Sequence, residues 1–234
     1  MSAPTRSPLS RERILSAAIS YVDEHDLASL TMRRLGQLLG VEAMSLYHYV
    51  NGREDLLEGM VSQLVDEIRV PPREAVGPAD GWQGFLQVVA HAVRGLAVEH
   101  PHLFPLIATR PPAAPWLRPP LRSLHLVDDF LEGLVGRGLS EEAVVRIYKS
   151  FTSFLLGHLL LEVADTSAQA VVGAEQLDEG EASRPEQERA LEKVPTVERL
   201  EPLLRRHDPE GEFERALEAL LVHLDRELEG TDDA

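Results

Sequence analysis

A chain of 234 residues with 44% hydrophobic residues can bury a core, which excludes disorder throughout. Its formal net charge of -16 excludes a protein that coats nucleic acid by bulk positive charge, so a nucleic-acid surface would have to be local. The absence of cysteine excludes disulfides, thiol nucleophiles and zinc–thiolate sites. We expect a cytoplasmic protein without a membrane partner, because the first residues lack the apolar core of a signal peptide and the longest apolar run, 151–161, is too short to span a bilayer.

The N-terminal part of the chain has the apolar spacing of short helices, and no alternating run predicts a strand. A first helix is predicted over residues 10–25, and a second from Thr31, its N-cap, to Gly40, which suits the left-handed position after a helix. A third, short helix is predicted over residues 42–50. The inner face of the first helix is predicted to consist of Ile14, Ala17, Ala18, Tyr21 and Val22.

A fourth helix links this part of the chain to the rest. Asn51 is its predicted cap, and Glu54 completes a capping-box pattern. Pro71 and Pro72 end the helix, so the predicted boundary separates a domain of residues 1–70 from one of residues 71–234.

Beyond the linker, every periodic segment is again helical. Helices are predicted over residues 82–100, 121–136, 140–164, 196–206 and 212–228. A proline-rich loop is predicted at 109–120 and a mobile loop at 165–187. The predicted fold class is therefore all-α: a three-helix helix-turn-helix domain joined by a linking helix to a C-terminal helical bundle.

Residues 31–53 separate into an apolar set and an exposed set. The apolar set, which would face the first helix, is Leu35, Leu38, Val41, Leu46 and Val50, and we also expect Tyr49 in the core. A helix, a glycine-containing turn and a short second helix match the helix-turn-helix unit, whose second helix enters the major groove of DNA. The exposed set is Arg33, Arg34, Ala43, Met44, Ser45, Tyr47, His48 and Arg53.

The exposed set indicates how such a unit would read DNA. Ala43, Met44 and Ser45 are small or unbranched and allow a close approach to base edges. Phosphate contacts are expected from Thr31, Tyr47, His48 and Arg53. The alternative is a helical hairpin with a solvated basic face; the charge layout favours DNA, because the segment holds three arginines and the single acid Glu42 in an acidic chain.

The run "TMRRLGQLLGVEAMSLYHYVNGREDLL" resembles the N-terminal domain of TetR-family transcriptional repressors. The stretches "WQGFL", "ATRP" and "FLLG" are similar to the regulatory domain of the tetracycline-repressor subgroup. The resemblance implies a homodimer that binds a palindromic double-stranded operator and releases it when a small molecule enters the C-terminal domain. By position, the family's operator contacts fall on Arg33, Ala43, Met44, Ser45, Tyr47, His48 and Arg53.

The last helix carries a coiled-coil-like seam of Phe213, Leu217, Leu220, Leu224 and Leu228. The resemblance implies that this seam joins the helix at 140–164 in a four-helix bundle across a two-fold axis. The alternative is that it packs within one subunit. We favour the dimer, because one recognition helix reads too few base pairs to select an operator.

A ligand cavity is expected in the C-terminal domain, although for each aromatic taken singly core packing is the commoner role. The candidate lining residues are Trp82, Phe85, Phe104, Trp116, Phe151 and Phe154, with Thr109, His158 and Glu162 as polar candidates. Aligned on the subgroup, Leu106, Val89 and Arg69 stand where the resemblance would place a metal-chelate histidine and two other drug contacts. The protein is therefore not expected to sense tetracycline or to need a metal or cofactor.

Other chemistry finds little support in the sequence. His100 and His102 flank Pro101 next to Glu99, and we expect solvated histidines there rather than a metal site. No glycine-rich phosphate loop, Ser-His-Asp order or paired carboxylates indicate an enzyme. The leading hypothesis is a repressor that a small, largely apolar effector releases by tilting residues 53–69. The alternative is a helical small-molecule-binding or scaffold protein whose N-terminal domain engages protein.

Overall fold

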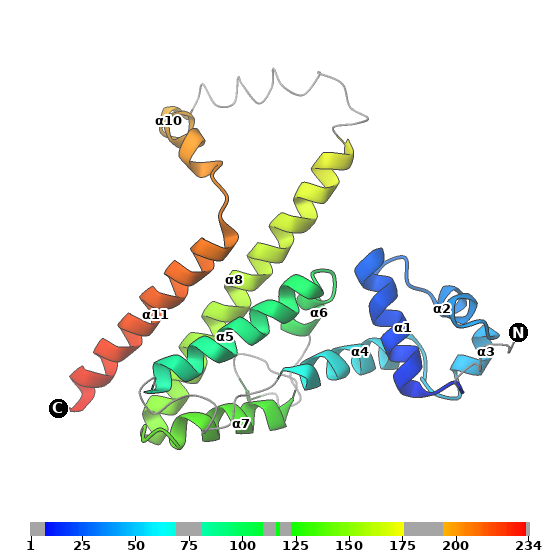
Figure 1. The fold of residues 1–234 in the computed structure, drawn as a ribbon, viewed down its shortest axis with the longest axis horizontal. Helices are drawn as coiled ribbons and strands as arrows, with labels where there is room; N and C mark the ends of the chain where they lie inside the picture. The colour runs from blue at the N-terminus through cyan, green and yellow to red at the C-terminus, as the bar shows by residue number, and fades with distance from the viewer. Residues whose placement is uncertain (1–7, 69–80, 110–115, 118–122, 176–193, 233–234) are drawn as a thin grey trace, which may run out of the picture. The chain divides into compact units, whose positions relative to one another are not determined.

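The computed structural model describes residues 8–68, 81–109, 116–117, 123–175 and 194–232, without the side chains of 165–175, 231 and 232 (Figure 1). These residues form ten helices and no strand, which confirms the all-α fold class. They divide into two compact units, Met1–Val163 and Ala164–Ala234. The boundary expected between residues 70 and 71 lies outside the described residues and stays a prediction.

The first two helices follow the predicted ranges to within one residue at each end. Helix α1 spans Arg11–Glu24, and the hydroxyl of Ser10 accepts a hydrogen bond from the backbone N–H of Arg13 at 3.2 Å. Helix α2 spans Met32–Leu39, capped by Thr31, and Gly40 follows it with a φ of 68°. Only a residue without a Cβ adopts that φ readily, so the glycine ends the helix and starts the turn.

The apolar face of α2 differs from the prediction by one residue. Leu38, expected in the core, is 56% exposed, whereas Leu39 is buried together with Leu35. Positions four apart lie on the same side of a helix, so Leu35 and Leu39 face α1 and Leu38 lies to one side. The predicted core position of Leu38 is therefore wrong.

Helices α3 and α4 also differ from the prediction in their bounds. Helix α3 spans only Ala43–Leu46, shorter than the predicted 42–50, and α4 spans Arg53–Glu67 with Gly52 as its N-cap. The carboxylate of Asp55 accepts from the backbone N–H of Asn51 at 2.7 Å. Asp55 thus takes the role that the capping-box pattern assigned to Glu54.

A continuous apolar core holds α1 to α4 together and extends beyond them. It contains the fully buried Ile14, Leu30 and Met60, and it includes Leu103 and Ile107 from the C-terminal part of the chain. Helix α5 spans Gly81–Glu99 and α6 spans Phe104–Thr109, a short helix that the sequence pattern did not predict. The N-terminal helices and α6 therefore share one core.

The remaining helices of the chain are α7, Leu124–Val135, α8, Glu141–Glu175, α10, Pro195–Leu204, and α11, Pro209–Asp232. Helix α8 continues through Glu175, so the loop expected at 165–187 is wrong for its first eleven residues, 165–175, and its remainder lies outside the described residues. On α11 the buried residues are Phe213, Leu217, Leu221 and Leu224, whereas Leu220 and Leu228 of the predicted seam are half-buried.

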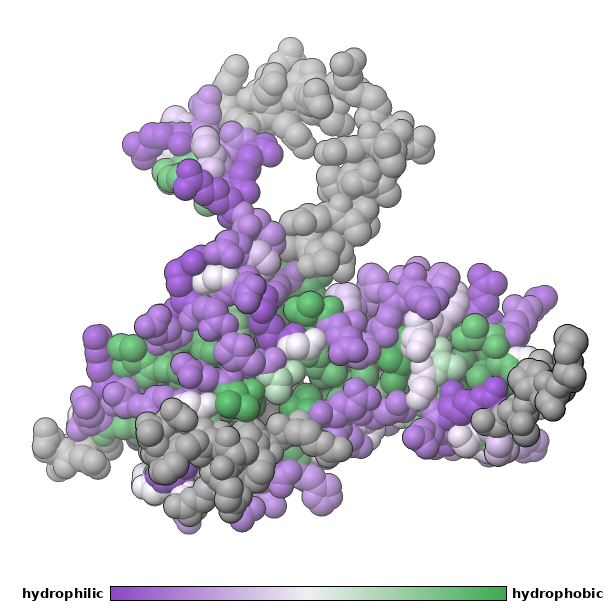
Figure 2. Space-filling view, viewed as in Figure 1, coloured by the Kyte–Doolittle hydropathy of each residue, from purple (hydrophilic) through white to green (hydrophobic). Residues whose placement is uncertain are grey.

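The surface of the described residues is mainly hydrophilic on the face that Figure 2 shows, with smaller hydrophobic areas between. Within the same residues, one stretch of α8, Glu141–Ala164, is long and apolar enough to cross a membrane by length and composition, although the apolar run within it, 151–161, was expected to be too short. Of the most apolar 18-residue segment of this stretch, 44% is buried. The core helix of a soluble protein can have the same length and composition.

Candidate functional site

The turn between α2 and α3 brings the two helices into direct contact. Gly36 is buried, and a Cβ on it would lie 3.0 Å from the carbonyl oxygen of Val41 and 3.2 Å from the Cα of Ala43. The carbonyl of Gly36 accepts from the N–H of Val41 at 2.9 Å. The glycine therefore lets the start of α3 pack against the backbone of α2, which fixes the angle between the two helices.

The residues expected to contact DNA are on the outer surface of this unit. Leu46 is fully buried and anchors α3, while Met44 is 74% exposed. Arg33, Tyr47 and His48 are exposed, and Ala43 and Ser45 are half-buried. The structure thus brings together a short helix with small side chains at its start and polar or aromatic side chains around it. Their contacts with DNA remain a prediction.

Tyr49 was missed as a member of this surface. It is 39% exposed, not in the core as expected. Helix α3 ends at Leu46, and the N–H groups of both Tyr49 and Val50 bond to the carbonyl of Leu46 in a tight turn. In that turn Val50 is buried and Tyr49 points outward. Tyr49 lies two residues after the exposed Tyr47, in a short polar segment, and this was the signal that could have placed it on the surface.

Two of the expected phosphate contacts also have structural roles. The hydroxyl of Thr31 accepts from the backbone N–H of Arg34 at 3.1 Å, so Thr31 caps α2. The guanidinium of Arg53 donates to the carbonyl of Leu30 and, at 2.8 Å, to the carbonyl of Leu27. Arg53 therefore holds the loop before α2, a role that sequence reasoning missed.

An ion pair ties α1 to the start of α4. The guanidinium of Arg11 lies 2.6 Å from a carboxylate oxygen of Asp55, and it also donates to the carbonyl of Tyr49 at 2.8 Å. The hydrogen bond from Arg11, together with that from the backbone of Asn51, lowers the pKa of Asp55 to about 2. The ionised carboxylate thus fixes the turn that follows α3.

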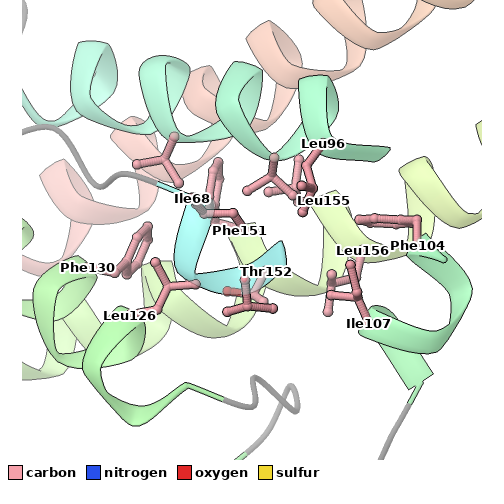
Figure 3. Close-up of a pocket in the computed structure, with 13 residues that line it drawn as sticks. Ile68, Leu96, Phe104, Ile107, Leu126, Phe130, Phe151, Thr152, Leu155 and Leu156 are labelled. Atoms are coloured by element: carbon pink, nitrogen blue, oxygen red, sulfur yellow. The ribbon is translucent and has the colours of Figure 1, made fainter. Parts of the chain in front are cut away.

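An apolar cavity lies among the helices of the first unit (Figure 3). Its volume is about 50 Å³. Thr152 is the one polar residue among the described residues that line it, and it is buried. The lining residues come from α4 to α8: Val65, Ile68, Val89, Val93, Leu96, Phe104, Ile107, Leu126, Phe130, Phe151, Thr152, Leu155 and Leu156.

Three of the expected cavity residues, Val89, Phe104 and Phe151, line this cavity. Phe130, which was not expected, lies between the rings of Phe85 and Phe151, with ring centroids 5.7 Å from each. It is the one aromatic residue in the predicted helix at 121–136, which could have identified it. Phe85 is fully buried beside the lining residues rather than among them.

The other expected cavity residues lie away from the described lining. Trp116 is 77% exposed, Thr109 is exposed and donates to the carbonyl of Pro105 at 2.7 Å, and Leu106 packs against the N-terminal core. Trp82 is half-buried, and Phe154 and His158 contact each other on α8 with centroids 5.5 Å apart. Arg69 lies outside the described residues. Effector binding by any of these residues remains a prediction.

Glu162 and His100 both pair with distant charged residues. Glu162 forms an ion pair with Arg94, with an N–O distance of 2.8 Å. His100 is 8% exposed, so the expectation of a solvated histidine is wrong: its imidazole faces Asp23. His102 is half-buried. Among the described side chains, no group of three or more histidines, aspartates and glutamates is arranged to hold a metal ion.

Known proteins resemble this chain in both sequence and fold. The family described as "Tetracyclin repressor-like, C-terminal domain" matches residues 76–226, more than half of the chain. The HTH-type transcriptional repressor DrrR1 of Streptomyces coeruleorubidus is 34% identical over 119 residues, which are 48% of this chain and 42% of that protein. The chain thus aligns with less than half the length of that relative.

Solved structures cover nearly the whole chain. A possible TetR family transcriptional regulator from Streptomyces coelicolor A3(2) is 27% identical, with a TM-score of 0.67 over 93% of this chain and 99% of that chain. The Streptomyces coelicolor protein ActR in complex with actinorhodin has the same fold at 22% identity, with a TM-score of 0.68 over 95% and 99%. By its match over residues 76–226, the chain belongs to the family of tetracyclin repressor-like proteins.

Proposed function

We propose that this protein is a DNA-binding transcriptional repressor that a small, largely apolar effector releases from a palindromic operator. The observation that carries the proposal is the surface of α2 and α3: Arg33, Met44 and Tyr47 are exposed, while the apolar residues beside them are buried. In a chain with a net charge of -16, such a local surface is suited to a polyanion. Family membership and the relatives described as repressors support the same function.

In this proposal α3 enters the major groove, and its first residues contact base edges. Met44 contacts an apolar group such as a thymine methyl, and Ser45 hydrogen-bonds to a base. Arg33, Tyr47, His48 and Thr31 bind phosphates and set the register. Arg53 contributes by holding the loop that precedes α2. Two copies of the chain, related by a two-fold axis, place two α3 helices in half-sites about 34 Å apart.

The cavity supplies the effector site. Its lining offers one hydroxyl, that of Thr152, among apolar groups, so the effector is uncharged and largely apolar. A volume of about 50 Å³ is far below the roughly 300 Å³ at which drug-sized pockets begin. Effector binding must therefore displace lining helices. Val65 and Ile68, at the end of α4, are among the residues that would move.

Movement of α4 changes the separation of the two reading helices. A difference of about 1–3 kcal/mol between the effector affinities of the two conformations lowers operator affinity about 5–150-fold. Tetracycline with magnesium is not expected to act, because Leu106 and Val89 replace the polar contacts that the family resemblance implies. A cytoplasmic location follows from binding to DNA.

The test begins with duplexes that the purified protein selects from a random pool, followed by titration of the best one. Arg33→Ala and Tyr47→Ala are expected to weaken binding at least about tenfold at low salt. The matched control is Arg226→Ala, which removes an exposed arginine from α11 and should leave affinity unchanged. Selection of no duplex at any salt concentration would favour the protein-binding scaffold instead.

A second experiment tests the effector site. Uncharged apolar compounds are screened for release of the selected duplex and for a rise in melting temperature. Thr152→Val keeps the shape of the side chain and removes its hydroxyl, so it should weaken the action of effectors that carry a hydrogen-bonding group. Release by charged compounds only, with no dependence on Thr152, would exclude this cavity as the effector site.

A further inference from the structure

A contact between Asp23 and His100 joins α1 to the residue that follows α5. The Nδ1 atom of His100 lies 3.0 Å from each carboxylate oxygen of Asp23. The two side chains are only 10% and 23% exposed for His100 and Asp23, respectively. The residues are 77 positions apart in the sequence, so this contact connects the DNA-reading part of the chain to its C-terminal part.

His100 is also bonded through its backbone to two residues of the cavity wall. Its N–H donates to the carbonyl of Leu96 at 2.9 Å, and its carbonyl accepts from the N–H of Phe104 at 2.9 Å. Leu96 and Phe104 both line the cavity. The residue that contacts α1 is thus the backbone bridge between the α5 wall and the α6 wall.

We propose that Asp23 and His100 are positioning residues, which fix α1, and with it α2 and α3, relative to the α5–α6 wall of the cavity. This inference rests on the proposed function. It adds a polar connection to the apolar ones made by α4, whose Val65 and Ile68 line the cavity, and by Ile107 of α6, which lines the cavity and belongs to the N-terminal core. A change in the cavity that shifts the turn at His100 reaches the reading helices directly through Asp23.

The chemistry of the pair suits this role. A hydrogen bond to a carboxylate is short and directional, so a displacement of about 1 Å removes most of it. If one partner moves away, the other polar group is left with little access to water. The free energy of the arrangement in which α1 has moved is therefore higher. The contact therefore favours one position of α1. An apolar contact, which is not directional, would allow α1 to move along its neighbour.

The first test measures affinity for a duplex selected by the wild-type protein and for an unrelated duplex, using fluorescence anisotropy at fixed salt. Asp23→Ala and His100→Phe are each expected to weaken specific binding about tenfold, and the double variant no more than either single one. Asp23→Asn, which keeps an oxygen acceptor, should recover much of the affinity. Binding to the unrelated duplex should change less than about twofold.

The matched control is Glu24→Gln, which removes a neighbouring negative charge from an exposed side chain of α1. Melting curves of each variant report the fold separately. The inference would be overturned if Asp23→Ala and His100→Phe bound the selected duplex as tightly as the control variant does. It would also be overturned if the loss of affinity in the double variant were the sum of the two single losses. A wild-type protein that selects no duplex would overturn the proposed function itself.

The second test asks whether the cavity acts through the pair. Val93→Phe adds volume to the lining and stands in for an effector. It should weaken specific binding in the wild-type background and weaken it at least about threefold less in the Asp23→Ala background. Equal effects in the two backgrounds, or no effect in either, would show that the cavity does not reach α1 through Asp23.

Discussion

At the scale of single residues, Arg53 has a structural role in the loop that precedes α2. Its guanidinium bonds to the carbonyls of Leu30 and Leu27, which requires the planar fork of an arginine. Arg53→Lys keeps the charge and loses at least one bond, so it should lower the free energy of unfolding by about 1–2 kcal/mol. Arg33→Lys, on the exposed surface of α2, is the control and should leave stability unchanged. Urea denaturation measures both, and equal stability of the two variants would refute the structural role.

Asp55 makes the stability of the N-terminal helices sensitive to acid. Its pKa is lowered to about 2 by the hydrogen bonds from Arg11 and Asn51, so its contribution is complete above the ordinary pKa of 3.8. That contribution disappears as the pH falls through about 2. Asp55→Asn should be less stable by about 1 kcal/mol at pH 6, a figure reduced for the partial exposure of the pair. The difference in the free energy of unfolding between Asp55→Asn and the wild type should shrink between about pH 4 and pH 2, as measured by urea denaturation at each pH. A difference that stays constant with pH would contradict the contribution of the ionised Asp55 carboxylate.

The residue-level predictions failed where a turn changed the direction of a side chain. Thr31 and Gly40 were identified correctly, because capping and a left-handed φ depend on local chemistry. Tyr49 and His100 were misplaced. The exposure of Tyr49 depends on where α3 ends, and the burial of His100 depends on a partner in α1, neither of which the local sequence contains.

At the scale of elements, the contact between α2 and α3 depends on Gly36. Gly36→Ala would place a Cβ 3.0 Å from a backbone oxygen that cannot move freely, so α3 must shift. We expect a loss of about 1–3 kcal/mol in stability and weaker binding to the selected duplex. Gly95→Ala is the control on α5, where a Cβ meets no atom within 4 Å, and it should raise stability by about 0.5–1 kcal/mol. Calorimetry and anisotropy measure both effects, and a neutral Gly36→Ala would refute the close packing.

The elements themselves were predictable to the extent that their apolar periodicity is strong. Helices α1, α2 and α5 follow the predicted ranges to within about one residue, and the all-α class followed from the absence of alternating runs. Helix α6 was missed because six residues are too short to show a period. The extension of α8 to Glu175 was missed because its polar, small residues show no apolar stripe. For the cavity, Val89, Phe104 and Phe151 were expected, but periodicity does not distinguish a lining residue from one packed in the core.

For the molecule as a whole, the net charge of -16 predicts that operator is discriminated from other DNA even at low salt. Acidic residues outside the reading surface repel phosphate, so binding to unrelated duplexes should be weak at low salt already. Each phosphate contact that is lost reduces the slope of log affinity against log salt by about 1. Arg33→Ala should therefore lower the slope by about that amount.

Met44→Ala gives the contrasting result, because Met44 is expected to contact a base and not a phosphate. It should leave the salt slope unchanged and alter the preferred base at one position of each half-site. Anisotropy titrations between about 50 and 200 mM salt, repeated on duplexes with each base at that position, separate the two effects. If both variants changed the slope equally and neither changed base preference, α3 would bind DNA by charge alone, and the assignment of α3 as the reading helix would be wrong.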